Sequence, residues 1–170
     1  MDRKPRGGVG GFKMGIDDEI VRLFREAIAA ENANDLEAAK RKFDKILELS
    51  RGERPEAYFE ACFRMADVFI QEDNYRGAVK CALRGICRAP SRELRRAGIQ
   101  RLGDVLFIMK RRGRLGVLTE NMDPALNLTR KEDPELYEFT VALTRLASGE
   151  KVRRAFPTEE LTEILNGLQG

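Results

Sequence analysis

Histidine and tryptophan are absent from this chain of 170 residues, and cysteine occurs only three times. Without histidine the chain cannot form a Ser-His-Asp triad or a Cys-His pair, and it lacks the side chain that most often ligates transition metals. No nucleophile motif or isolated pair of carboxylates takes the place of these groups. We therefore expect a protein that is not an enzyme and that needs no metal or cofactor.

The cysteines, Cys62, Cys81 and Cys87, are odd in number and match neither a disulfide framework nor a CxxC metal site. This usage favours a reducing compartment, and we expect a cytoplasmic protein. Cys62 and Cys81 fall at positions predicted to be buried in helices, where cysteine acts as a small apolar residue.

Long hydrophobic runs are also missing. No uncharged apolar stretch approaches the 18 or so residues of a membrane span, and residues 1–15 lack the apolar region of a signal peptide. We therefore expect neither a membrane span nor a signal peptide. With 42% hydrophobic and 35% charged residues, the chain has enough apolar material for one domain with a charged surface.

Apolar residues recur with the period of an α-helix from Ile16 onward. The pattern predicts long helices, one or two short helices over 114–132, and two more after Asp133 and Thr158. Asp17 or Asp18 is expected to cap the first helix, and Ser91 and Asp133 to cap later ones. No segment alternates like a strand, so the sequence predicts an all-α protein.

A short stretch recurs at a fixed interval. Residues 34–39 (NDLEAA) align with residues 73–78 (DNYRGA) at a shift of 39. The shift places Ala39 with Ala78 and, in the preceding helices, Ala27 with Ala66. A further shift of 37 adds Gly103 to the second set. Small residues at one recurring site predict helices that approach closely there.

This pattern resembles the tetratricopeptide repeat family, whose repeat runs W-x2-L-G-x2-Y, then A-x3-F, then P. The matching residues of the second repeat are Cys62, Met65, Ala66, Phe69, Ala78, Ala82 and Pro90, and Ala39 and Phe43 match in the first. The resemblance implies a right-handed stack of antiparallel helix hairpins, an α-solenoid. Its repeats would span 16–53, 54–90 and a degenerate 91–132, with capping helices over 133–170.

The resemblance also implies a function. In that family the first helix of each repeat lines a groove that binds a protein partner. The candidate groove residues here are Arg25, Arg64, Asp67, Arg101 and Asp104. A clamp for a partner's carboxylate is one interpretation of them. The other is that Arg64 with Asp67, and Arg101 with Asp104, form ion pairs within their own helices.

Basic residues concentrate between positions 84 and 114. This segment contains ten of them and only two acidic residues, Glu93 and Asp104. Besides Arg101 the basic residues are Arg84, Arg88, Arg92, Arg95, Arg96, Lys110, Arg111, Arg112 and Arg114. Three interpretations stay open: contact with the phosphate backbone of RNA or a ribonucleoprotein, contact with an acidic protein, and a solvated face paired with the acidic flanks. Few aromatic residues accompany the run, so base stacking has no evident platform.

Residues 1–15 form a glycine-rich basic segment, which we expect to be a flexible tail. Its cations, Arg3, Lys4, Arg6 and Lys13, would add to any attachment to RNA. The sequence thus favours a non-enzymatic adaptor that binds a protein partner. The alternative is a protein that binds RNA or a ribonucleoprotein through phosphate contacts.

Overall fold

The computed structural model describes residues 15–170, and every regular element within them is a helix. The prediction of an all-α protein is confirmed for this part of the chain. The tail residues Arg3, Lys4, Arg6 and Lys13 lie outside it. In chain order the elements are α1 (Ile16–Asn32), α2 (Leu36–Ser50), α3 (Pro55–Gln71), α4 (Tyr75–Cys87), α5 (Arg92–Arg111), the 3-10 helix η2 (Leu115–Thr119), α6 (Asp123–Glu132), α7 (Pro134–Ala147) and α8 (Glu159–Gln169).

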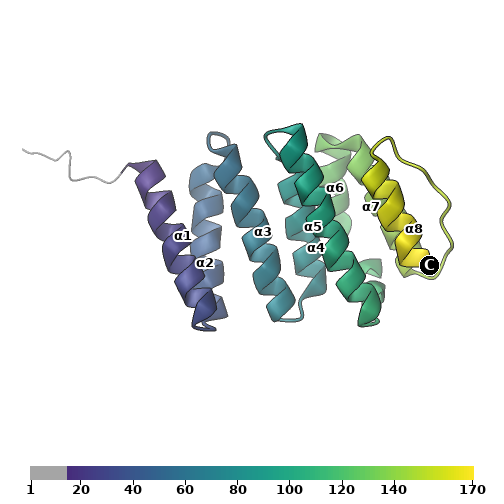
Figure 1. Cartoon of the computed structure of the whole chain (residues 1–170), viewed down its shortest axis with the longest axis horizontal. Helices are drawn as coiled ribbons and strands as arrows, with labels where there is room; N and C mark the ends of the chain where they lie inside the picture. The colour runs from purple at the N-terminus through teal and green to yellow at the C-terminus, as the bar shows by residue number, and fades with distance from the viewer. Residues whose placement is uncertain (1–14) are drawn as a thin grey trace, which may run out of the picture.

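The α-helices form two layers (Figure 1). A front layer of α1, α3, α5 and α8 faces the viewer, and a back layer of α2, α4, α6 and α7 lies behind it. From α1 to α5 each helix packs on the next in the chain. The order then changes, because α6 packs on α4 and α7, while α8 packs on α5 and α7.

The last helix extends the front layer in the same direction as its neighbour. Near the start of both helices Arg96 of α5 pairs with Glu160 of α8, with 2.6 Å between the nitrogen and the oxygen. Near their ends the Lys110 ammonium donates to the Gly167 carbonyl at 3.0 Å. The two helices are therefore parallel, and α8 stands beside α5 at the C-terminal side of the layer.

One turn geometry ends each of the first three front-layer helices. Asn34, Asp73 and Gly113 all have a positive φ, of 61°, 58° and 67°. In each case the next amide donates to a carbonyl five residues back, at 2.8 Å. Such a bond satisfies a carbonyl that the helix end leaves without a partner. The shift of 39 between the first two turns was predicted from the sequence.

The position of the third turn differs from the repeat alignment predicted from the sequence. It follows the second by 40 residues, whereas Gly103 was aligned with Ala66 at a shift of 37. The reason is a difference in length, since α3 has 17 residues and α5 has 20. Gly103 does mark a close approach, but its partner is Ile164 of α8, whose side chain lies 3.0 Å from where a Cβ would stand.

Most predicted helix starts are confirmed, and one is wrong. The side chains of Ser91 and Asp133 accept from backbone amides three residues later, at 3.1 and 3.2 Å. The cap of α1 is Gly15 rather than Asp17 or Asp18, and both aspartates lie in the first turn. There they still face the positive end of the helix dipole.

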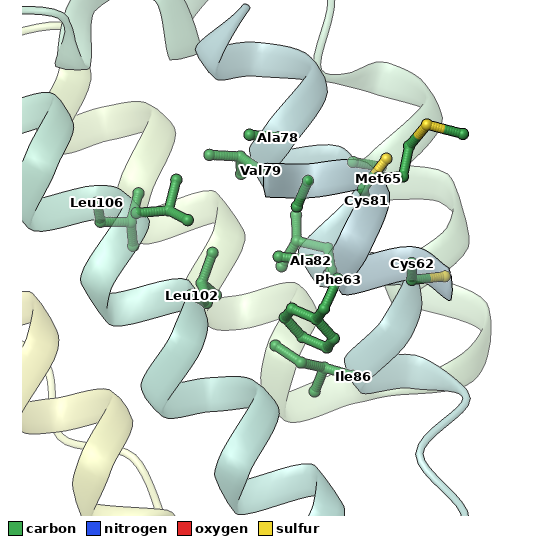
Figure 2. Close-up of a cluster of buried hydrophobic side chains, with 14 of the residues drawn as sticks. Cys62, Phe63, Met65, Ala78, Val79, Cys81, Ala82, Ile86, Leu102 and Leu106 are labelled. Carbon is green, nitrogen blue, oxygen red and sulfur yellow. The ribbon is translucent and has the colours of Figure 1, made fainter. Parts of the chain in front are cut away.

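Phe63 is a buried residue of the core that lies between two glycines. A Cβ on Gly85 of α4 would stand 2.8 Å from the Phe63 ring, and a Cβ on Gly98 of α5 would stand 3.0 Å from it. Figure 2 shows the ring next to Ile86, with side chains of α4 and α5 around it. Only glycine at both positions leaves room for the ring, so α3, α4 and α5 meet here.

The first hairpin fills the corresponding space in another way. Phe43 and Ile46 on α2 are fully buried, and the Phe43 ring meets Phe24 edge to face with centroids 6.3 Å apart. The shift of 39 matches Phe43 with Ala82 and Ile46 with Gly85. Large residues on the second helix of one hairpin thus correspond to small residues in the next, where Phe63 supplies the volume.

Truncation of Phe43 tests this part of the core. We expect Phe43→Ala to lower the free energy of unfolding by about 3–5 kcal/mol, because it empties a fully buried site. Val21→Ala is the matched control, since Val21 is 56% exposed on α1. Urea denaturation measures both. A loss below about 1 kcal/mol for Phe43→Ala would contradict the packing described here.

An added methyl group tests the glycine contact. In Gly98→Ala the new Cβ would lie within 3.2 Å of Ile86, Phe63 and Phe59. The overlap should outweigh the better helix propensity of alanine and destabilise the protein by about 1–2 kcal/mol. Gly116→Ala is the control, because no atom lies within 4 Å of its Cβ position. Equal melting temperatures for the two variants would refute the close approach.

Candidate functional site

A hollow of about 420 Å³ lies on the front layer between α3 and α5, next to the end of α1. Ile70, Val105 and Ile108 give it an apolar floor. Polar and charged side chains form the rim. Its lining residues are Glu31, Asp67, Ile70, Gln71, Arg101, Asp104, Val105 and Ile108.

A second hollow, of about 310 Å³, continues from the first between α5 and α8. Phe107 and Ile164 are its largest apolar residues. Gln100, Gly103, Asp104, Glu160 and Glu163 complete the lining. Since Asp104 borders both hollows, they follow one another across α5, and we refer to the pair as the front groove.

Three of the five predicted groove residues meet in this groove. Asp67, Arg101 and Asp104 line the hollow between α3 and α5. Arg25 and Arg64 do not line either hollow. Arg64 instead lies along its own helix, where its Nε donates to the Glu60 carboxylate at 3.0 Å.

The predicted ion pairs within the helices are wrong. Arg64 pairs with Glu60 rather than Asp67, and Arg101 reaches across to α3 rather than to Asp104. The Arg101 guanidinium lies 3.7 Å from Glu60, 3.8 Å from Asp67 and 4.5 Å above the Phe63 ring. The ring draws Arg101 towards α3, because a guanidinium is attracted to an aromatic face.

The front groove carries a surplus of negative charge. Its lining includes the carboxylates Glu31, Asp67, Asp104, Glu160 and Glu163, against the single cation Arg101. Burial raises the pKa of Asp67, and Arg101 opposes that shift. A groove of this charge does not suit a clamp for a partner's carboxylate, which needs cations and neutral donors.

The sequence did not reveal most of this lining. Glu31, Ile70 and Ile108 lie near helix ends, and Glu163 lies on a helix predicted only as a cap. The period of the apolar residues indicates which positions face the core, but it does not indicate that α8 stands beside α5. The resemblance to stacked hairpins was the one available signal, because a capping helix at the end of a stack would cover the last front helix.

Much of the basic run is already paired within the described residues. Arg88 donates to both oxygens of Glu132, at 2.8 and 3.0 Å, and Arg96 binds Glu160. The acidic partners come from the region after residue 131. The interpretation of a face paired with the acidic flanks therefore holds for Arg88, Arg95 and Arg96.

Arg95 has the most partners of these arginines. It donates to both oxygens of Asp133 at 3.1 Å, to Glu135 at 3.1 Å and to the Thr158 hydroxyl at 3.2 Å. Burial disfavours the charged form of Glu135, yet hydrogen bonds from Thr158 and Arg95 hold its pKa below the usual value. This network joins the start of α5 to the starts of α7 and α8.

The basic residues at the end of α5 have other partners. Lys110 donates to the carbonyl groups of Gly167 and Gly170, at 3.0 Å each. Arg112 donates to the Tyr75 hydroxyl, and the Arg114 guanidinium lies 5.2 Å from the centre of the same ring. Within the described part of the chain, Arg84, Arg92, Arg111 and Arg114 are the members of the run that make no ion pair or side-chain hydrogen bond.

The three thiols are held in the protonated form. Burial raises the pKa of Cys62 and of Cys87 to about 12, and that of Cys81 to about 11. Cys62 and Cys81 are buried, as predicted, and Cys87 is partly buried. At neutral pH these thiols are therefore weak nucleophiles.

Residues 15–170 contain neither a cluster of metal ligands nor a helix that could span a membrane. None of these residues form a group of three or more cysteine, aspartate or glutamate side chains placed to hold a metal ion. No helix in the same range is long and apolar enough to cross a membrane. Comparison with protein-family models, with curated proteins and with solved structures gives no match for this chain.

Removal of the Arg95 guanidinium tests the network at the start of α5. Arg95→Met should lower the free energy of unfolding by about 1–3 kcal/mol at pH 7, because it leaves two partly buried carboxylates without their cation. Arg92→Met is the control, since Arg92 is exposed on the same helix.

The effect should depend on pH. The lowered pKa of Glu135 contributes stability above the unfolded pKa, about 4.3, and loses it as the pH falls through the folded pKa. The difference between Arg95→Met and the unsubstituted protein, measured by urea denaturation, should therefore be nearly constant from pH 7 to about pH 5 and shrink as the pH falls below about 4.3. A difference that does not depend on pH would contradict this account.

Proposed function

We propose that this protein is a non-enzymatic adaptor, built of stacked helix hairpins like those of tetratricopeptide repeats, that binds a basic segment of a partner protein in the front groove. The observation that carries the proposal is the groove itself. It combines an apolar floor with a rim of carboxylates, and it runs over three parallel elements of one layer.

The chemistry of the groove defines the segment that it suits. Ile70, Val105 and Ile108 offer apolar contact, which supplies affinity when it is removed from water. The carboxylates around them, Asp104 above all, favour lysine and arginine side chains and disfavour acidic ones. A chain of alternating apolar and basic residues would place both kinds of side chain at once.

The hairpin stack is supported by three observations in the described residues. The same turn ends α1, α3 and α5, the small residues Ala27, Ala39, Ala66 and Ala78 are almost fully buried, and α8 lies parallel to α5. Stacked hairpins present one long face formed by their first helices, and in such architectures that face is suited to binding extended partners.

The alternative function, attachment to RNA or a ribonucleoprotein, has weaker support. A nucleic-acid strand needs several cations in a row, each free to neutralise a phosphate. Arg88, Arg95 and Arg96 are bound to carboxylates of this chain, which breaks the basic run into separate groups. The acidic front groove would also repel a phosphate backbone.

Selection of peptides on the full chain tests the proposal. Random peptides displayed on phage should yield sequences that combine basic and apolar residues. A labelled selected peptide should then bind Asp104→Arg at least about tenfold more weakly, a loss of about 1.4 kcal/mol. The measurement is fluorescence anisotropy at physiological salt.

Glu48→Arg is the matched control, because Glu48 is an exposed carboxylate on α2 in the back layer. It should bind the peptide with unchanged affinity, and thermal unfolding should show that both variants fold. Failure to enrich any peptide, or equal binding to Asp104→Arg and the unsubstituted chain, would refute the front groove as the binding site.

A further inference from the structure

A pocket of about 470 Å³ lies against α4 and α6 of the back layer, away from the front groove. Its charged lining consists of three arginines from two parts of the chain: Arg51 in the turn after α2, and Arg84 and Arg88 at the end of α4. Tyr58, Pro124 and Leu128 complete it. We call it the arginine pocket.

The arginines differ in how many of their donors are already used. Arg88 donates hydrogen bonds from its Nε and one terminal nitrogen to Glu132. These bonds hold the guanidinium 5.4 Å from the centre of the Tyr58 ring. Arg51 and Arg84 make no ion pair or side-chain hydrogen bond with any residue in 15–170. Their guanidinium groups therefore keep all their donors for a ligand.

Tyr58 supplies a second, independent observation. Tyr58 as a residue is only 6% exposed and lines the pocket, yet its hydroxyl has no hydrogen-bond partner among the residues that the structure describes. Burial raises the pKa of this hydroxyl, against the opposing effect of Arg84, Arg88 and Arg51, so the group stays a donor at neutral pH. Most polar groups of buried residues are paired within the protein, so an unpaired hydroxyl beside three cations is available to an acceptor in the pocket.

Every polar side chain that lines the pocket can donate a hydrogen bond, and the net charge of the lining residues is positive. Two carboxylates lie near these arginines. Glu132 binds Arg88, and burial raises the pKa of Asp44 on α2, a shift that the charge of Arg84 opposes. Three guanidinium groups thus outnumber two carboxylates. The preferred ligand is an anion with several acceptor oxygens.

We propose that the arginine pocket binds a phosphate monoester dianion. A phosphoryl group carries nearly two charges at pH 7 and three acceptor oxygens, which matches two free arginines and one free hydroxyl. A carboxylate offers one charge and two oxygens, and would leave donors unpaired. Pro124 and Leu128 at the edge offer apolar contact to whatever carries the phosphoryl group.

The pocket suits one phosphoryl group better than a strand of RNA. A strand presents singly charged diesters at regular intervals and needs cations beyond the pocket on both sides. Of the next arginines of the run, Arg92 makes no ion pair or side-chain hydrogen bond within residues 15–170, whereas Arg95 and Arg96 are bound to Asp133, Glu135 and Glu160. One unpaired arginine, Arg92, follows the pocket before the run is interrupted, which is fewer than the several cations that a strand needs.

Calorimetric titration of the full chain tests this site. The probes are inorganic phosphate, a peptide containing one phosphoserine, and the same peptide with unmodified serine, with sodium acetate at equal ionic strength as the reference anion. Phosphate and the phosphopeptide should bind, whereas acetate and the unmodified peptide should not. Tighter binding of the phosphopeptide would identify a modified protein as the source, and equal binding would identify a free phosphate compound.

Three variants locate the binding. Arg84→Gln, which keeps most of the side-chain stem, should weaken phosphate binding at least about tenfold. Tyr58→Phe should weaken it severalfold by removing only the hydroxyl. Arg41→Gln is the matched control, because Arg41 is an exposed arginine on α2 outside the pocket, and it should bind normally.

Three results would overturn the proposal: equal responses to phosphate and acetate, unchanged binding by Arg84→Gln, or a short single-stranded RNA that binds more tightly than the phosphopeptide and displaces it. Unfolding curves without phosphate confirm that each variant folds. Because the pocket and the front groove share no residue, Asp104→Arg should bind phosphate normally, and the two proposals can fail separately.

Discussion

The arrangement of the helices depends on the contact of Phe63 with Gly85 and Gly98. The ring occupies the space that a Cβ would take on either glycine, so it sets how closely α3, α4 and α5 approach. Its outer face then holds the Arg101 guanidinium at 4.5 Å. A single buried ring thereby joins the packing of the core to the placement of the cation in the front groove, and the groove depends on the core for its geometry.

The charge of the front groove and of the arginine pocket depends on which residues form ion pairs, and not only on where charged residues lie in the sequence. Residues 84–114 carry most of the positive charge, and the region after 131 supplies acidic partners for Arg88, Arg95 and Arg96. These ion pairs neutralise three arginines of the basic run. They leave carboxylates in the front groove and Arg51 and Arg84 in the arginine pocket, so the groove and the pocket carry opposite charge.

The local features were predictable because neighbours in the sequence determine them. The turns at Asn34 and Asp73, the cap at Ser91 and the burial of Phe43 all follow from spacing and residue type. The partners of Gly103 and Arg101 were not, because each depends on which helix comes to lie alongside. Three extra residues in α5 moved the third turn, and α8 rather than the following segment took the place beside Gly103.

The helix α5 connects the C-terminal helices to the front groove. Its first turns hold Arg95 and Arg96, which tie α7 and α8 to it, and its later turns carry Arg101 to Ile108, which line the front groove. Glycine at 103 lets α8 approach closely, but an exchange of one methyl group for hydrogen supplies little attraction of its own. The ion pairs at the start of α5 and the Lys110 contacts near its end therefore hold α8 in place, and they also hold one wall of the groove. Because such contacts weaken with salt and with protonation of the carboxylates, the far side of the groove should be its most adaptable part.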